Sequence, residues 1–205
     1  MLILVRHGQT DPNVQGLLLG RADPPLTEAG YRQACALAAA LPRAERIVSS
    51  PLARARHTAA VLAGAAKGVP DAPEVEVDAR WIEMDYGELD GCPPSALGER
   101  SWQTWREDPD FVPAGGESLA AVCARVREAC EELAEDAAQG NVVVVSHVSP
   151  IKAAVTWALG VGVEVGWRMF LADAAICRID TSGTVPLLLA FNDAGPVTAG
   201  DRAAR

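Results

Sequence analysis

The stretch Leu2-Ile3-Leu4-Val5-Arg6-His7-Gly8 decides how the rest of the chain is interpreted. An aliphatic run that ends in a charged residue and a glycine is typical of a buried strand that stops at the edge of a sheet. The segment Val142-Val143-Val144-Val145-Ser146-His147 has the same form far along the chain. In an open parallel sheet, ligands bind beyond the carboxyl ends of the strands. We therefore expect His7 and His147 to lie at one edge of such a sheet.

Outward from these two segments, short apolar runs alternate with alanine-rich stretches of helical character. This alternation predicts an α/β fold, a three-layer α/β/α sandwich with a mostly parallel central sheet. The predicted strands are Leu2 to Arg6, Arg46 to Ser49, Val75 to Val77, Asn141 to Ser146, Ala174 to Asp180 and Val185 to Phe191. The predicted helices are Thr27 to Leu41, Pro51 to Ala65, Ser118 to Gln139 and Pro150 to Leu159, with Thr27 and Ser118 as N-caps.

The 205 residues suit one domain, which we place at 1–192, followed by a flexible tail at 193–205. Residues 84–116 carry prolines, glycines and aromatics without a sustained period, which favours an insertion that covers a site. Trp102, Trp105, Arg106 and Phe111 in this insertion either shape the mouth of a pocket or form a small core of their own.

Composition excludes several classes of function. A formal net charge of -9 without a basic patch disfavours nucleic acid and anionic lipid as partners. No apolar stretch reaches membrane-spanning length, so we expect a cytoplasmic protein with no membrane contact. The five cysteines are odd in number and include no C-x-x-C, which suggests neither a disulfide framework nor a zinc site. Oligomeric state is open, with a homodimer as one option.

Arginines accompany the candidate histidines. Arg6 directly precedes His7, and Arg54 falls in the first turn of the helix predicted after Ser49-Ser50. Guanidinium groups and helix N-termini both favour phosphate. A single histidine or arginine of this kind is more often structural, but two of the chain's three histidines stand at equivalent strand ends. The third, His57, lies in a helix and is interpreted as a surface or structural residue.

These residues, in this order, resemble the histidine phosphatase superfamily, the phosphoglycerate mutase-like proteins, along nearly the whole chain. The similar segments are Arg6-His7-Gly8-Gln9-Thr10, the stretch 20–30, Ser50-Pro51-Leu52-Ala53-Arg54-Ala55, Glu83-Met84-Asp85-Tyr86-Gly87, Gly115-Gly116-Glu117-Ser118 and Ser146-His147. Because several blocks occur in the same order, the probability that the similarity arose by chance is very small. The resemblance implies the phosphoglycerate mutase-like form of the sandwich.

The resemblance also implies an activity. It is that of a metal-independent phosphomonoesterase without a cofactor, which acts on a small phosphorylated metabolite through a phosphohistidine on His7. Arg6, Arg54 and a protonated His147 would bind the phosphoryl oxygens. Glu83 would be the proton donor, with Glu88 and Glu117 as competitors for this role. The further expected substrate contacts are Asn13, Leu19, Gly20 and Val148.

Two departures from the family pattern bear on substrate choice. Val148 stands where family members usually have glycine, and Met84-Asp85 stands where the mutases carry basic residues that hold a carboxylate. Since an acidic residue there would repel phosphoglycerate, hydrolysis is favoured over transfer. Two alternatives stay open: a 2,3-bisphosphoglycerate-dependent phosphoglycerate mutase, and a non-catalytic module that binds a phosphorylated ligand.

Overall fold

The computed structural model describes residues 1–65 and 73–194. Its core is a sheet of six strands in the order β3-β2-β4-β1-β5-β6. Strands β3, β2, β4 and β1 run parallel, whereas β5 and β6 are antiparallel to their neighbours. Their bounds are β1 Leu2–Arg6, β2 Arg46–Ser49, β3 Val75–Val77, β4 Val142–Ser146, β5 Ile176–Asp180 and β6 Leu187–Asp193. The predicted mostly parallel sheet is therefore confirmed.

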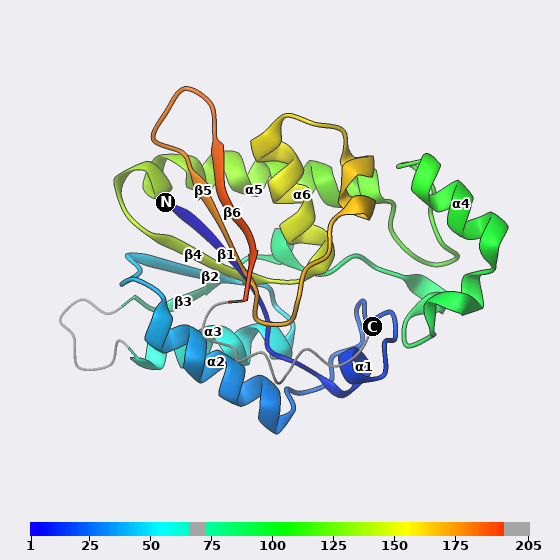
Figure 1. Cartoon of the computed structure of the whole chain (residues 1–205), viewed down its shortest axis with the longest axis horizontal. Helices are drawn as coiled ribbons and strands as arrows, with labels where there is room; N and C mark the ends of the chain where they lie inside the picture. The colour runs from blue at the N-terminus through cyan, green and yellow to red at the C-terminus, as the bar shows by residue number, and fades with distance from the viewer. Residues whose placement is uncertain (66–72, 195–205) are drawn as a thin grey trace.

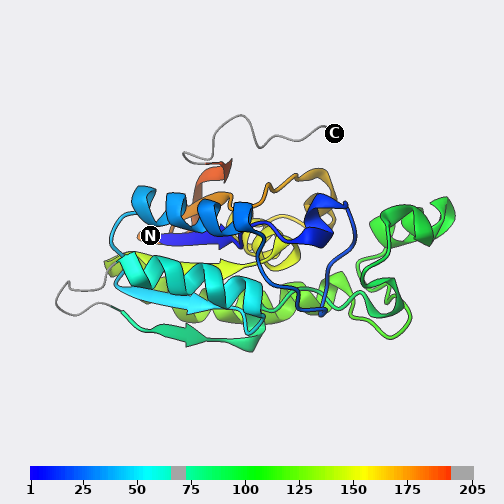
Figure 2. The same cartoon turned by 90° about the horizontal axis from the view of Figure 1, so that it is seen from below.

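Helices cover both faces of the sheet (Figures 1 and 2). The helices are α2 Glu28–Ala40 and α3 Ala53–Ala65 on one face, and α5 Leu119–Gln139 and α6 Val148–Leu159 on the other. Alternate residues of β1 divide between the two cores, because successive side chains of a strand point to opposite faces. Leu2 and Leu4 pack with the α5 side, and Ile3 and Val5 pack with the α2 side. This is the predicted three-layer sandwich.

The helix starts that we predicted from capping residues are more accurate than those that we predicted from prolines. The predicted N-caps are in place, since Thr27 accepts a hydrogen bond from the Gly30 N–H at 3.0 Å and Ser118 accepts one from the Ala121 N–H at 3.1 Å. Helix α6 begins earlier than predicted, directly after His147. A proline at the third helical position, Pro150, is tolerated because the N–H groups of the first turn have no helical partner.

Other boundaries differ by a few residues. Helix α3 begins at Ala53 rather than Pro51, β5 begins at Ile176 rather than Ala174, and β6 is shifted toward the carboxyl terminus. Strand β6 ends at Asp193, inside the predicted tail, and residues 195–205 of that tail lie outside the described residues. No helix in the described ranges is long and apolar enough to span a bilayer.

The segment 84–116 contains more regular structure than its sequence indicated. It holds α4 Glu99–Glu107 and two short 3-10 helices, and a further short helix, α1 Asp11–Val14, was also not predicted. Trp105 is fully buried, with its ring 5.3 Å from that of Trp102, 5.8 Å from Phe111 and 5.5 Å from Trp167. The aromatics of this segment therefore pack together and join the core on the α5 side of the sheet. Figure 2 shows α4 at the end of the molecule toward which the parallel strands point.

Candidate active site

Adjacent parallel strands bring the two candidate histidines together. Strands β1 and β4 are neighbours, with Arg6 paired to Ser146, so the next residue of each strand is a histidine at the same sheet edge. His7 and His147 are both buried, and their ring centroids lie 5.0 Å apart. The convergence expected from the sequence is present in the structure.

Hydrogen bonds fix the orientation of the His7 ring. Its Nδ1 lies 2.7 Å from the carbonyl oxygen of Gly8 and must donate, because a carbonyl only accepts. The Nε2 atom then keeps its lone pair and accepts from Nε of Arg54 at 3.3 Å. Burial, and after it Arg6 and Arg54, lower the pKa of His7 well below its ordinary value. His7 is therefore a neutral imidazole with Nε2 available as a nucleophile.

Glycines hold the loop that follows His7 close to helix α2. A side chain on Gly8 would bring its Cβ to 2.3 Å from the carbonyl oxygen of Gly30, and one on Gly30 would come to 2.2 Å from that of Gln9. Backbone approach this close requires glycine at both positions. The Gly8 N–H also donates to Oγ1 of Thr58 on α3 at 3.1 Å, so three elements fix the position of His7.

Arg54 is a fully buried cation beside His7. Its guanidinium donates to the carbonyl of Ala22 at 2.7 Å and to that of Gly20 at 2.8 Å. Asp23 lies 3.7 Å from it and also accepts from the Ala53 N–H at 2.8 Å, which caps α3. Burial lowers the pKa of Arg54, although a guanidinium remains charged in proteins. The positive charge is thus held rigidly against Nε2 of His7.

Arg6 supplies a second cation from the end of β1. It donates to the carbonyl of Leu171 at 2.7 Å and forms an ion pair with Asp173 at 2.8 Å. The guanidinium is therefore anchored at one end, and its buried Nε–H is left without a partner among the described residues.

His147 is arranged differently from the protonated residue expected from the sequence. Its Nε2 lies 2.6 Å from Oγ of Ser50, which also accepts from the Leu52 N–H at 3.3 Å. Because the described residues offer the Ser50 hydroxyl no other acceptor, its proton is assigned to Nε2, which places the ring proton on Nδ1. Burial, and after it His7 and Arg54, lower the pKa of His147 well below its ordinary value. This direction favours a neutral ring, whereas the sequence led us to expect a protonated one.

The Nδ1 atom of His147 is buried without a hydrogen-bond partner in the described part of the chain. Buried polar groups normally have partners, so this donor indicates a place for an anionic ligand. Ser50, which orients the ring, had been noted in the sequence only as a helix start. Its position at the end of β2, next to β4 in the sheet, is the signal that could have revealed it.

Glu83 is buried at the N-terminus of α6. Its carboxylate accepts from the Met84 N–H at 2.7 Å, the Val148 N–H at 3.0 Å and the Ser149 N–H at 3.2 Å. The Val148 N–H, expected to contact phosphate, thus binds Glu83 in this structure. The two competitors lie elsewhere: Glu88 is exposed, and Glu117 is paired with Arg125 at 2.9 Å.

The remaining predicted contacts are the residues Asn13, Leu19 and Gly20, and two of them form hydrogen bonds within the protein. Oδ1 of Asn13 accepts from the Thr10 N–H at 3.1 Å and so closes the first turn of α1. The Gly20 N–H donates to Asp90 at 2.8 Å, and Leu19, which precedes it, is buried. The structure therefore places Gly20 against the site through its carbonyl, which accepts from Arg54. Asp90, an anchor for this loop, was not identified from the sequence.

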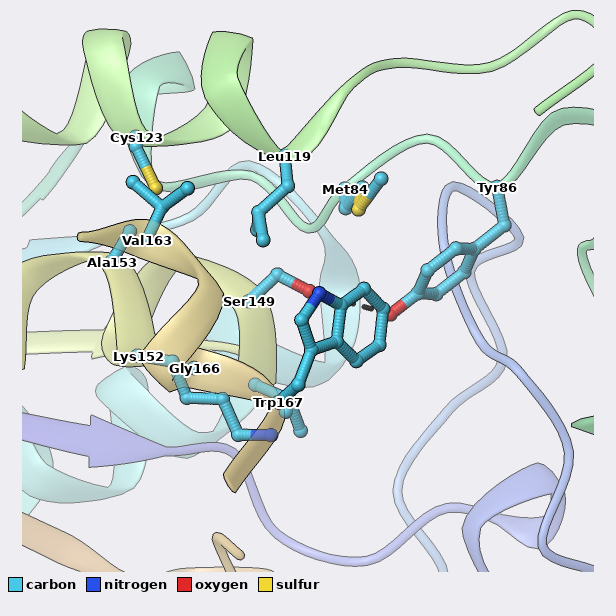
Figure 3. Close-up of a pocket in the computed structure, with 11 residues that line it drawn as sticks. Met84, Tyr86, Leu119, Cys123, Ser149, Lys152, Ala153, Val163, Gly166 and Trp167 are labelled. Carbon is cyan, nitrogen blue, oxygen red and sulfur yellow. Dashed lines mark hydrogen bonds between the residues drawn. The ribbon is translucent and has the colours of Figure 1, made fainter. Parts of the chain in front are cut away.

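Figure 3 shows a cavity of about 130 Å³ that is lined in part by Met84, the residue after Glu83. Val148 and Ser149, whose N–H groups bind the Glu83 carboxylate, also line it. The other lining residues are Met84, Tyr86, Leu119, Cys123, Lys152, Ala153, Val163, Gly166 and Trp167. Within residues 1–65 and 73–194, no group of His, Cys, Asp and Glu side chains has an arrangement that could hold a metal ion.

With the fold and this pair of histidines described, comparison with known proteins gives the family. Residues 2–194 match the model of the histidine phosphatase superfamily (branch 1). The chain belongs to this superfamily, as its sequence motifs predicted.

Named relatives include more than one activity. The chain is 38% identical over 181 residues to a bifunctional protein of Mycobacterium tuberculosis, covering 85% of this chain but 48% of that protein, so it spans about half that relative's length. It is 39% identical over 197 residues to phosphoserine phosphatase 1 of Hydrogenobacter thermophilus, covering 93% of this chain and 91% of that protein. A 2,3-bisphosphoglycerate-dependent phosphoglycerate mutase of Beijerinckia indica is 36% identical over 166 residues, 76% of this chain and 79% of the mutase.

Among solved structures, a mycobacterial glucosyl-3-phosphoglycerate phosphatase superimposes with a TM-score of 0.80. Its sequence is 30% identical, and the match covers 94% of this chain and 98% of the phosphatase. The similarity therefore extends over the whole sandwich.

Proposed function

We propose that this protein is a metal-independent phosphomonoesterase for a small phosphorylated metabolite. The main support is that the ring centroids of His7 and His147 lie 5.0 Å apart and that Arg54 donates to Nε2 of His7. A nucleophile, a rigid cation and an unpartnered donor therefore face one small volume. Relatives named as phosphatases support hydrolysis as the reaction.

In the first step, Nε2 of His7 attacks phosphorus and the bond to the ester oxygen breaks. Arg54, Arg6 and the Nδ1 proton of His147 stabilise the phosphoryl oxygens in place of a metal ion. Opposite charges 4 Å apart gain about 4 kcal/mol at an effective dielectric near 20, so two fixed guanidinium groups supply a substantial part of the stabilisation. The product is a phosphohistidine and an alcohol.

Glu83 serves both halves of the reaction in this proposal. Its carboxyl group gives a proton to the departing ester oxygen and later takes one from the water that attacks phosphorus. The bond between phosphorus and Nε2 then breaks, which restores neutral His7 and releases phosphate. The N-terminus of α6 orients the carboxyl group, because Val148 and Ser149 donate to it.

Purified protein should release phosphate from a generic aryl phosphate in the presence of excess EDTA at the rate seen without the chelator. Fixed arginines, rather than a metal ion, neutralise the phosphoryl oxygens in the proposed reaction. The measurement is inorganic phosphate released over time with and without EDTA. Activity that EDTA removes and an added divalent cation restores would contradict a metal-independent reaction.

Glu83→Gln should lower turnover of an alkyl phosphate by about 10²- to 10³-fold, and of an aryl phosphate by less than about 10-fold. A poor leaving group depends on the proton that Glu83 donates, whereas a phenolate leaves with little help. The check is kcat/KM for both ester types. The exposed Glu88→Gln serves as the matched control and should leave both values unchanged. Equal losses on both esters would exclude Glu83 as the proton donor.

A phosphoglycerate mutase is the second candidate, favoured by the mutase relatives. It would need 2,3-bisphosphoglycerate to phosphorylate His7. The test is to measure interconversion of 3- and 2-phosphoglycerate in the presence of that primer. If interconversion is faster than phosphate release, the main activity is phosphoryl transfer rather than hydrolysis.

A further inference from the structure

Asp90 connects the stretch before α4 to the loop that precedes α2. Its Oδ1 accepts from the Gly20 N–H at 2.8 Å, and its Oδ2 accepts from the Ala22 N–H at 2.7 Å. The next residue, Gly91, donates from its N–H to the Leu18 carbonyl at 2.7 Å. Both oxygens of the carboxylate therefore hold a loop that is also bonded through its backbone.

The same loop residues bind Arg54 through their carbonyls. The Ala22 carbonyl accepts from Nη1 of Arg54 at 2.7 Å, and the Gly20 carbonyl accepts from Nη2 at 2.8 Å. Asp90 thus holds the N–H groups of the two residues whose carbonyls hold the guanidinium. The loop has little room to shift, because a Cβ on Gly20 would lie 2.8 Å from the Met84 carbonyl oxygen. A displacement of the carboxylate would therefore move the carbonyls that bind Arg54.

The position of the Arg54 guanidinium depends on these carbonyls. Of the five N–H donors of a guanidinium, the contacts with His7, Gly20 and Ala22 engage three, and the proposed reaction uses the others for phosphoryl oxygens. Burial lowers the pKa of Arg54, and Asp90 is one of three carboxylates that act in the opposite direction. Asp90 thus supports both the place and the charge of this cation.

We propose that Asp90 is a positioning residue of the reaction, which acts on the phosphoryl group only through Arg54. The carboxylate fixes the loop, the loop fixes the guanidinium, and the guanidinium binds the phosphoryl oxygens. This inference rests on the proposed phosphatase function. The segment 84–116, predicted as a cover over the site, then also supports the cation that binds phosphate.

A double-mutant cycle tests this route. Asp90→Asn replaces one acceptor oxygen by an NH₂ group, so one of the two loop N–H groups loses its partner. The value of kcat/KM for an aryl phosphate should fall by about 10- to 100-fold, as expected when a catalytic group is misplaced by about 1 Å. In Arg54→Met protein, the same change should lower it by less than about 3-fold, because the two residues act as one unit.

The matched control is Asp110→Asn, an exposed aspartate of the same segment. It removes the same charge from a solvent-screened position, so kcat/KM should remain within about 2-fold of the wild type.

A measurement on Arg54 itself does not require turnover. Its buried Nε–H should give a ¹H–¹⁵N NMR signal that exchanges slowly with water, and Arg54→Lys identifies this signal by its loss. In Asp90→Asn its exchange should be at least about 10-fold faster relative to the backbone N–H of Val144, which lies in the buried strand β4. In Asp110→Asn the ratio should be unchanged. The reference to Val144 separates a local change at Arg54 from a general loss of stability.

Two outcomes overturn the Asp90 assignment. One is an equal loss of kcat/KM from Asp90→Asn with and without Arg54, and the other is an Arg54 signal whose exchange changes no more than that of Val144. If the wild type hydrolyses aryl phosphates but either outcome is found, the proposed reaction stands without this role for Asp90. If it releases no phosphate, the proposed reaction fails, and the NMR comparison alone decides whether Asp90 positions Arg54.

Discussion

His7→Ala is expected to lower phosphomonoesterase turnover by about 10⁴-fold or more, because no other group near phosphorus can form the covalent intermediate. His147 cannot substitute, since its Nε2 is bonded to Ser50 and its Nδ1 carries a proton. The measurement is phosphate release at saturating aryl phosphate, with circular dichroism to confirm folding.

The matched control is His57→Ala, an exposed histidine on α3. Its turnover should equal that of the wild type. Undiminished activity in His7→Ala, or equal losses in both variants, would contradict the assignment of His7 as the nucleophile.

Arg54→Met should lower kcat/KM by about 10³-fold, the lower end of what an arginine that stabilises a transferring phosphoryl group contributes. The methionine keeps much of the side-chain volume but removes the charge beside Nε2 of His7. Arg54→Lys should recover only part of the loss, because a single ammonium cannot reach the carbonyls of Gly20 and Ala22 and the phosphoryl oxygens together.

Arg56→Met, two residues along α3 but exposed, is the control for loss of a positive charge. It should remain within about 2-fold of the wild type, since an exposed charge is screened by solvent. If Arg56→Met lowers kcat/KM as much as Arg54→Met does, the overall positive charge of α3, rather than a direct contact from Arg54, stabilises the phosphoryl group.

The strands, and the histidines that follow two of them, could be predicted from the sequence because local residue patterns determine where strands form and end. A buried aliphatic run ending at His7 or His147 has one plausible place in an α/β sheet, and pairing of Arg6 with Ser146 brings the two rings together. The resemblance to the histidine phosphatase motifs also predicted the form of the fold and pointed to Glu83 as a site residue. Boundaries at Ala53 and Val148 were less accurate, because proline tolerates several positions in a first helical turn.

Features that depend on long-range packing could not be predicted. The lowered pKa of His147 follows first from its burial, and its ring contacts the hydroxyl of Ser50, 97 positions away in the chain. Helix α4 is short and largely polar, and its one buried residue, Trp105, packs against Trp167 of a distant segment.

The most direct measurement of the proposed chemistry is rapid-quench trapping of the enzyme with a ³²P-labelled phosphate monoester, in EDTA, followed by peptide mapping at alkaline pH. The proposed mechanism predicts transient, acid-labile label on the peptide that contains His7, formed at least as fast as steady-state turnover and absent from His7→Ala. Turnover without any labelled protein, or label that persists in His7→Ala, would contradict a phosphohistidine at this position.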